Sequence, residues 1–145
     1  MNLLQGYLNR SKITGKMMTN KIQMCEDEFF FNYIKSEVSK AKNEIILFFP
    51  YIKVKVLDSL MENCKVKKIS IITSWSIWNI SQGALDLAIY PYCKKNNITL
   101  YSNIRSHLKS IIIDGKSILF GSANLSHSGM GLTKNNNYEL FSNKF

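Results

Sequence analysis

Residues 107–130 read HLKSIIIDGKSILFGSANLSHSGM, and this stretch is the most informative part of the sequence. Two apolar runs flank the pair Asp114-Gly115, which is a strong signal for a tight hairpin turn. The Gly-, Ser- and Asn-rich segment 121–131 then predicts a turn that encloses a short helical turn. We therefore expect an antiparallel ribbon, followed by a closing strand over 138–141.

Upstream of this ribbon, the spacing of apolar residues alternates between the helical period and the strand period. The helical pattern over 82–96 contains Pro91, which is expected to kink or interrupt that helix. Such alternation predicts βαβ units around a largely parallel sheet with helices on both faces, an α/β fold. The expected helices cover 26–41, 54–64 and 82–96, and the expected strands cover 44–49, 67–73 and 98–101.

The composition fits one compact domain with a strongly basic charge. The chain has 145 residues, 46% of them hydrophobic, and a formal net charge of +9. This charge indicates a polyanionic partner, either nucleic acid or an anionic membrane surface, although an AT-rich genome would also enrich lysine. We expect a basic N-terminal arm over 1–24, or alternatively a frayed terminus, and a catalytic domain over 25–145.

The cysteines and the apolar runs indicate a soluble cytoplasmic protein without a membrane segment. The three cysteines form no CxxC pair, which favours reduced thiols over a disulfide framework. No apolar run is long enough to span a bilayer, and the N-terminus lacks the apolar core of a signal peptide.

The strand that starts at His107 carries the residues expected to perform chemistry. His107 and Lys109 are two residues apart, so their side chains share one face of a strand and can form a phosphate site. Phosphodiester cleavage needs a nucleophile and cations for the non-bridging oxygens, which these two side chains supply. Asp114 has the opposite parity, and its pairing with glycine is already explained by a tight turn.

Two downstream elements can complete this site. Ser122 and Asn124 lie where a helix could begin, so they either bind phosphate or cap that helix. Glu139 is expected to accept a hydrogen bond from Nδ1 of His107 and to fix its tautomer. Trp75 and Trp78, in the loop after a central strand, either stack on nucleic-acid bases or pack at the rim of the core.

The pattern His107-x-Lys109-x4-Asp114, then Gly121-Ser122-x-Asn124, then Asn137-Tyr138-Glu139, resembles the signature of the phospholipase D superfamily. The resemblance covers the last forty residues or so, in order and in spacing. It implies a layered α-β-α sandwich with a mixed, mostly parallel sheet. It also implies that His107 forms a phosphohistidine, that Lys109 and Asn124 bind phosphoryl oxygens, and that a second histidine protonates the leaving group. No metal and no other cofactor is implied.

Members of this superfamily combine two copies of the motif, whereas this chain has one, because His127 is followed by Gly129 where lysine should stand. The resemblance therefore implies a homodimer that completes the active site. The alternative is a second motif in a longer chain, of which this domain would be a C-terminally truncated part.

The expected function is a metal-independent phosphodiesterase, with DNA endonuclease activity in restriction or defence as the favoured reading. A phospholipase or phosphatidyltransferase acting on lipid is the alternative enzyme. It should have an exposed apolar rim or a membrane-anchoring helix, and the sequence reveals neither. A nucleic-acid-binding module without catalysis is the alternative of a different class.

Overall fold

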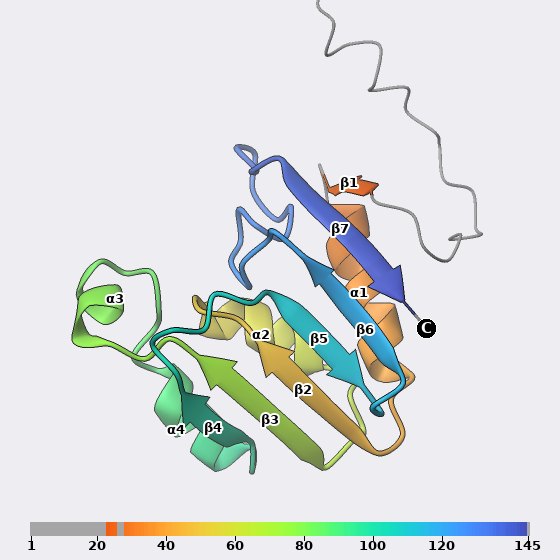
Figure 1. Ribbon diagram of the computed structural model, residues 1–145, viewed down its shortest axis with the longest axis horizontal. Helices are drawn as coiled ribbons and strands as arrows, with labels where there is room; N and C mark the ends of the chain where they lie inside the picture. Colours follow the sequence, from red (N-terminus) through yellow and green to blue (C-terminus); the bar gives the residue numbers. More distant parts are fainter. Residues whose placement is uncertain (1–22, 26–27, 145) are drawn as a thin grey trace, which may run out of the picture.

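The computed structural model describes residues 23–25 and 28–144, which form one mixed sheet and the helices packed on it (Figure 1). The part of the expected basic arm that precedes residue 23 lies outside the described residues. The strands are β1 Gln23–Cys25, β2 Glu44–Phe48, β3 Lys68–Thr73, β4 Thr99–Ser102, β5 Ser110–Ile113, β6 Ser117–Gly121 and β7 Glu139–Lys144. The helices are α1 Glu28–Ser39, α2 Val54–Met61, α3 Ile77–Ser81 and α4 Ile89–Lys95.

The seven described strands are ordered β1-β7-β6-β5-β2-β3-β4. Pairing is parallel between β2 and β3 and between β3 and β4, and antiparallel between all other neighbours. Because β5 and β7 alone run against β2, most described strands still point the same way. The expected α/β fold with a mixed sheet is confirmed, and parallel neighbours occur only in its βαβ half.

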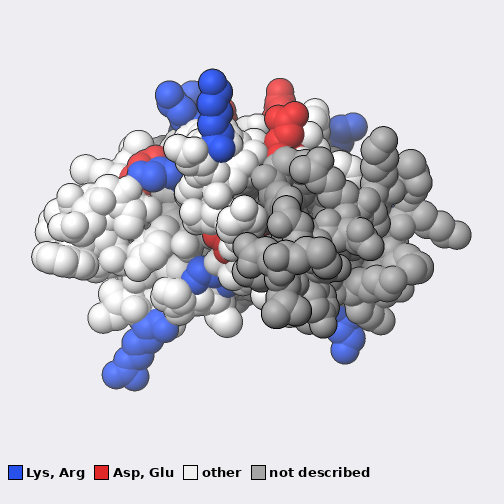
Figure 2. Space-filling model, turned by 90° about the horizontal axis from the view of Figure 1, so that it is seen from above, with Lys and Arg blue, Asp and Glu red and all other residues white. Residues whose placement is uncertain are grey.

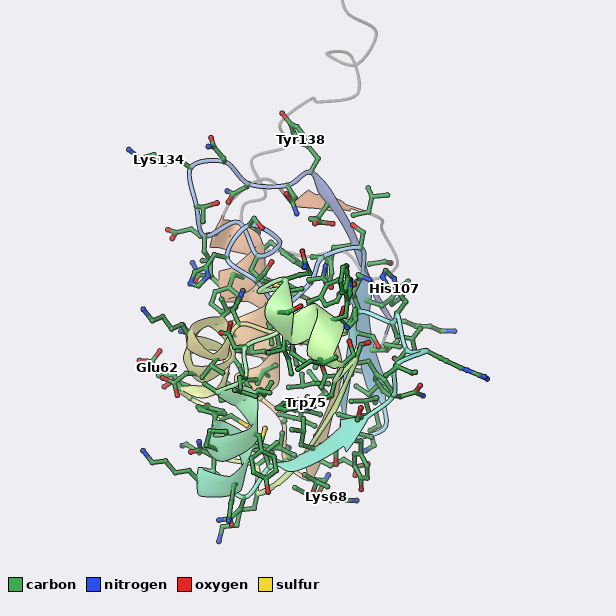
Figure 3. All side chains as sticks on the ribbon, turned by 90° about the vertical axis from the view of Figure 1, so that its left-hand side faces the viewer. Glu62, Lys68, Trp75, His107, Lys134 and Tyr138 are labelled. Atoms are coloured by element: carbon green, nitrogen blue, oxygen red, sulfur yellow. The ribbon has the colours of Figure 1, made fainter. Side chains whose placement is uncertain are left out.

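The hydrophobic core lies between the sheet and the helices α1, α2 and α4. These helices lie on one side of the sheet in Figures 1 and 3. On that face Ile45, Leu47 and Ile111 are fully buried, whereas alternate strand residues such as Ile46 and Phe120 remain partly or largely exposed. Helices on both faces were expected, but the described residues place no helix on the second face.

The expected hairpin between β5 and β6 is present. Asp114 and Gly115 both have positive φ, 54° and 64°, as a tight turn between antiparallel strands requires. The turn residue Asp114 also accepts hydrogen bonds from the backbone N–H groups of Asn43 and Glu44, at 2.7 and 3.0 Å. The hairpin is therefore tied to the start of β2.

The prediction of a helix over 82–96 was wrong in its starting position. Residues 82–88 form turns, and α4 begins only at Ile89, so Pro91 lies in the first turn of the helix. A proline is tolerated there because the first N–H groups of a helix have no partner within it. Residues 122–131 form no regular helix, but Met130 N donates to the Ser126 carbonyl oxygen at 3.0 Å, which closes the single helical turn that was expected in this segment. None of the helices in the described residues is long and apolar enough to cross a membrane.

Candidate active site

The candidate site lies at the edge of the sheet where β2 and β3 end and β5 begins. His107 and Lys109 come just before β5, so the strand is shorter than the expected run from His107. The ribbon nevertheless reaches Lys109, because its carbonyl oxygen accepts a hydrogen bond from Gly121 N at 3.1 Å. The backbone that carries the two side chains is thus held by the neighbouring strand.

His107 and Lys109 lie side by side, as their spacing predicts. Nζ of Lys109 is 2.9 Å from Nδ1 of His107 and donates to the His107 carbonyl oxygen at 2.9 Å. The side chain of His107 is exposed, so its ring is open to a substrate or to another chain. An imidazole and an ammonium group therefore lie together at this edge of the sheet, where Figure 3 labels His107.

Tyr51 contacts the imidazole, and the sequence analysis did not identify it. Its ring meets that of His107 edge to face, with centroids 6.4 Å apart and planes at 90°. Tyr51 follows Pro50 at the carboxyl end of β2, and this position at the reactive edge of the sheet is the signal that could have found it.

The pKa of Lys109 is lowered from its ordinary value by burial, and the negative charge of Glu139 partly opposes this shift. Apolar side chains line a small cavity against Lys109, among them Phe49, Ala123 and Met130. An ammonium group in such surroundings is poorly screened by water, so it interacts more strongly with an incoming phosphate than a solvated lysine would.

The Gly121-Ser122-x-Asn124 turn is fixed against β7. A Cβ added to Gly121 would lie 2.2 Å from the Leu140 carbonyl oxygen, so the two strands approach too closely for any larger residue. Ser122 donates a hydrogen bond from Oγ to Oε2 of Glu139 and accepts one from Leu140 N at 2.9 Å. This arrangement explains the glycine and the serine of the pattern by packing and hydrogen bonding.

Asn124 has a side-chain oxygen that is buried without a hydrogen-bond partner among the described residues. Such a group is costly to leave unpaired, which is one sign of a site built for a ligand. The alternative that Ser122 and Asn124 cap a helix is wrong, because Oγ of Ser122 accepts its hydrogen bond from Leu140 N and Oδ1 of Asn124 accepts none among the described residues.

Glu139 is buried next to the turn, but it does not contact His107 in this structure. Its carboxylate accepts hydrogen bonds from Ser122 Oγ and from Nδ2 of Asn137, the latter at 3.1 Å. Nδ1 of His107 instead faces Lys109. Glu139 acts on Lys109 through its charge, which raises the pKa of that side chain.

The remaining residues expected near the site make no ring contact or hydrogen bond with His107 among those of the described residues. Asp114 is at the opposite end of β5, in the hairpin turn. His127 is exposed in the turn after Ser126. Trp75 packs against the core and meets Tyr90 edge to face at 6.5 Å, whereas Trp78 is 69% exposed.

Comparison with protein families finds a match to the model described as cardiolipin synthase, PLD-like domain, over residues 34–145. Comparison with curated proteins finds no match. The fold is similar to NucT from Helicobacter pylori, with 19% identity, a TM-score of 0.59 and coverage of 84% of this chain and 83% of that one. It is also similar to Nuc from Salmonella typhimurium, a phospholipase D family member, with 18% identity, a TM-score of 0.57 and coverage of 86% and 82%.

Phosphatidylserine synthase from Haemophilus influenzae has a similar fold as well, with 15% identity, a TM-score of 0.65 and coverage of 85% of this chain and 32% of that one. The neighbours therefore include a phospholipase D family member and a phosphatidylserine synthase on one architecture. Since the family match spans more than half of the sequence and includes every residue of the His-Lys pattern, the chain belongs to the phospholipase D superfamily.

Proposed function

We propose that this protein is a metal-independent phosphodiesterase that cleaves nucleic acid, with DNA as the favoured substrate and a covalent intermediate on His107. One observation carries the proposal: an exposed imidazole lies 2.9 Å from the partly buried ammonium group of Lys109. The formal net charge of +9 favours a polyanionic substrate. The similarity to NucT and Nuc supports the presence of the fold that the proposed reaction requires.

In the first step a ring nitrogen of His107 attacks phosphorus, and the bond from phosphorus to the leaving oxygen breaks. Lys109 binds the non-bridging oxygens, and the amide of Asn124 supplies a further hydrogen bond to them. A general acid gives its proton to the leaving oxygen. In the second step water attacks phosphorus, the bond to His107 breaks, and the proton of water returns to the group that acted as acid.

The general acid is proposed to be His107 of a second copy of the chain. The sequence contains two histidines, and the second, His127, lacks a lysine two residues later. A twofold dimer would place one His107 as nucleophile opposite another as acid, and twofold pairing is the commonest symmetry of homo-oligomers. A second motif in a longer chain would serve the same purpose.

A lipid phosphodiester is the second candidate substrate, and a specific observation favours it. Large apolar side chains are exposed near the reactive edge, among them Ile104 at 71% and the neighbour of the catalytic pair, Leu108. The sequence did not reveal this rim. We place lipid second because the rim is interrupted by Ser102, Asn103 and Arg105, which would lose water at an apolar surface.

The experiment that tests the proposal is cleavage of supercoiled plasmid and of single-stranded DNA in excess EDTA. His107→Ala removes the proposed nucleophile, and His127→Ala is the matched control, since both side chains are exposed. We expect cutting by the parent and by His127→Ala, and none by His107→Ala. Mass spectrometry of samples quenched rapidly without acid, because the bond between phosphorus and histidine is acid-labile, should show one fragment of the cleaved strand joined through its phosphorus to His107.

Three results would contradict the proposal. Loss of cutting in EDTA that is restored by a divalent cation would exclude metal independence. DNA binding without cutting by a folded, dimeric parent would favour a binding module. Cleavage of phosphatidylglycerol vesicles, with DNA left intact, would favour the lipid enzyme.

A further inference from the structure

The helix α3 is an exposed projection at the reactive edge of the sheet. It lies beyond the end of β3 in Figure 1, and it stands foremost in Figure 3, which looks onto that side of the molecule. None of its residues is buried, and Ile77 and Trp78 are 84% and 69% exposed. Trp78 is thus a large aromatic ring that packs little against this chain.

From this projection we infer a base-binding site: Trp78 stacks on an unpaired base of the substrate, so the preferred substrate is single-stranded nucleic acid. The inference rests on the proposed function and specifies the substrate class of the same site. A base inside a duplex is already stacked on its neighbours, whereas an unpaired base offers a free face to an aromatic ring.

Polar side chains hold the projection in one conformation. Nδ2 of Asn79 donates to the carbonyl oxygen and to Oγ of Ser74, at 2.8 and 3.0 Å. Oγ of Ser76 caps the helix by accepting from Asn79 N at 3.1 Å. The exposed position of Trp78 is therefore set by a hydrogen-bonded scaffold, which limits the entropy lost when a base stacks on the ring.

The same scaffold connects α3 to the catalytic pair. Oγ of Ser102 donates to the Trp75 carbonyl oxygen at 3.4 Å, and Asn103 N donates to the Thr73 carbonyl oxygen at 2.9 Å. Ser106 N, in turn, donates to the Asn103 carbonyl oxygen at 3.0 Å, directly before His107. The residues that precede α3 are thus bonded to the segment that precedes His107, and we infer that a strand bound at His107 extends along this edge toward α3.

The charge of this region suits a polyanion. Arg105 and Lys109 lie between β4 and β5 at the reactive edge, and Asp86 is the one acidic residue of segment 63–113. The Asp86 carboxylate is already paired with Lys53 at 3.0 Å and with Val54 N at 2.9 Å. No described carboxylate at α3 would repel a phosphate backbone.

The distribution of the basic residues favours a single strand over a duplex. On the part of the surface that Figure 2 colours, Lys and Arg side chains form no continuous patch. A rigid duplex gains its affinity from many phosphate contacts along a line, whereas a single strand combines fewer phosphate contacts with stacking.

An anionic bilayer is less suitable as the partner of α3. The side chains of Ser76, Asn79 and Ser81 are partly or largely exposed on the projection beside Ile77 and Trp78. Insertion of the tip would remove water from these polar groups, which is unfavourable. Stacking requires only the face of one ring.

The test is fluorescence anisotropy with a labelled twelve-nucleotide oligo-dT and with a labelled duplex of the same length. The full chain is used with His107→Ala in every sample, so that cleavage does not interfere. Into this protein we introduce Trp78→Ala, Trp78→Phe and, as a matched control from the same region, Leu87→Ala, which also alters an exposed apolar side chain. Circular dichroism checks folding.

We expect Trp78→Ala to weaken oligo-dT binding roughly tenfold, the order expected for one stacked base, and to leave duplex binding unchanged. Trp78→Phe and Leu87→Ala should retain most of the affinity. Equal oligo-dT binding by Trp78→Ala, or an equal loss for duplex and single strand, would overturn the inference. So would Trp78-dependent binding to phosphatidylglycerol vesicles without binding to oligo-dT.

A second measurement applies if Trp78→Ala does not fold. The chain has two tryptophans, so Trp75→Phe leaves Trp78 as the sole indole, and stacking on oligo-dT should quench its fluorescence. No quenching would reject the inference. Cleavage is measured separately: Trp78-dependent binding without cleavage rejects the proposed function alone, and cleavage with Trp78-independent binding rejects this inference alone.

Discussion

The hydroxyl of Ser122 donates a hydrogen bond to the carboxylate of Glu139 and accepts one from the backbone of the next residue, Leu140. One small side chain thus links the end of β6 to the start of β7 and satisfies a buried acid. Oγ of Ser122, the Glu139 carboxylate and the Leu140 N–H group therefore form one hydrogen-bonded chain.

Ser122→Ala should destabilise the fold, because it leaves the Glu139 carboxylate with one donor fewer in a buried position. The expected loss in the free energy of unfolding is about 1–3 kcal/mol, the usual cost of an unsatisfied buried polar group. Urea denaturation measures it. The control is Ser142→Ala in β7, which should change the free energy of unfolding by less than about 0.5 kcal/mol. Equal losses of stability in the two variants would refute the role given to Ser122.

Glu139→Gln should change the pH dependence of cleavage. Burial lowers the pKa of Lys109 and the charge of Glu139 raises it, so removing that charge lowers the pKa further. If the ammonium form binds phosphate, the alkaline limb of kcat/KM should move to lower pH. The control is Glu62→Gln, whose carboxylate pairs with Lys35 instead. An unchanged limb in Glu139→Gln would show that the two charges are not coupled.

Tyr51→Ala should lower kcat by a factor of about three to ten, which corresponds to the ~0.5–1.5 kcal/mol of an edge-to-face ring pair. KM should change little, because Tyr51 acts on the orientation of His107. Tyr51→Phe keeps the ring and should keep kcat. If Tyr51→Phe were as slow as Tyr51→Ala, the hydroxyl rather than the ring would be the active part.

Asp114→Ala should make the stability of the protein less sensitive to acid. Hydrogen bonds from the backbone N–H groups of Asn43, Glu44 and Lys42 hold the pKa of Asp114 below its ordinary value of 3.8. The pKa of Asp114 is lower in the folded state than in the unfolded state. Its carboxylate therefore stabilises the fold fully at pH values above the unfolded pKa, and this stabilisation is lost as the pH falls through the folded pKa.

The measurement is thermal denaturation of parent and Asp114→Ala from neutral pH down to pH ~2. The parent should melt at higher temperature near neutrality, and the gap should narrow over the acidic range. A gap that is constant with pH would mean that the carboxylate charge does not contribute to stability.

The sequence predicted those parts of the structure that depend on neighbouring residues. The Asp114-Gly115 pair specified its hairpin, because both positions adopt positive φ. The separation of two residues along an extended backbone correctly predicted that His107 and Lys109 lie side by side. The helices α1 and α2 followed from apolar periodicity, with boundaries within a few residues of those expected.

The parts that failed depend on contacts between distant segments. The helix α3 has no apolar periodicity and is held by Asn79 and the serines around it. Glu139 was expected to accept a hydrogen bond from His107 but accepts one from the hydroxyl of Ser122, because the register of β6 against β7 places that hydroxyl next to the carboxylate. Tyr51 reaches His107 only after β2 and β5 pair.

The attachment of Asp114 to the start of β2 has a consequence for the reactive edge at the other end of the same strand. β5 pairs with β2 from Ile113 opposite Ile45 to Ser110 opposite Phe48. A slip of one residue along this ladder would turn every side chain of the strand to the opposite face. The hydrogen bonds of Asp114 thus fix the register of β5 against β2, and this register determines the face of the sheet on which the side chains of His107 and Lys109 lie.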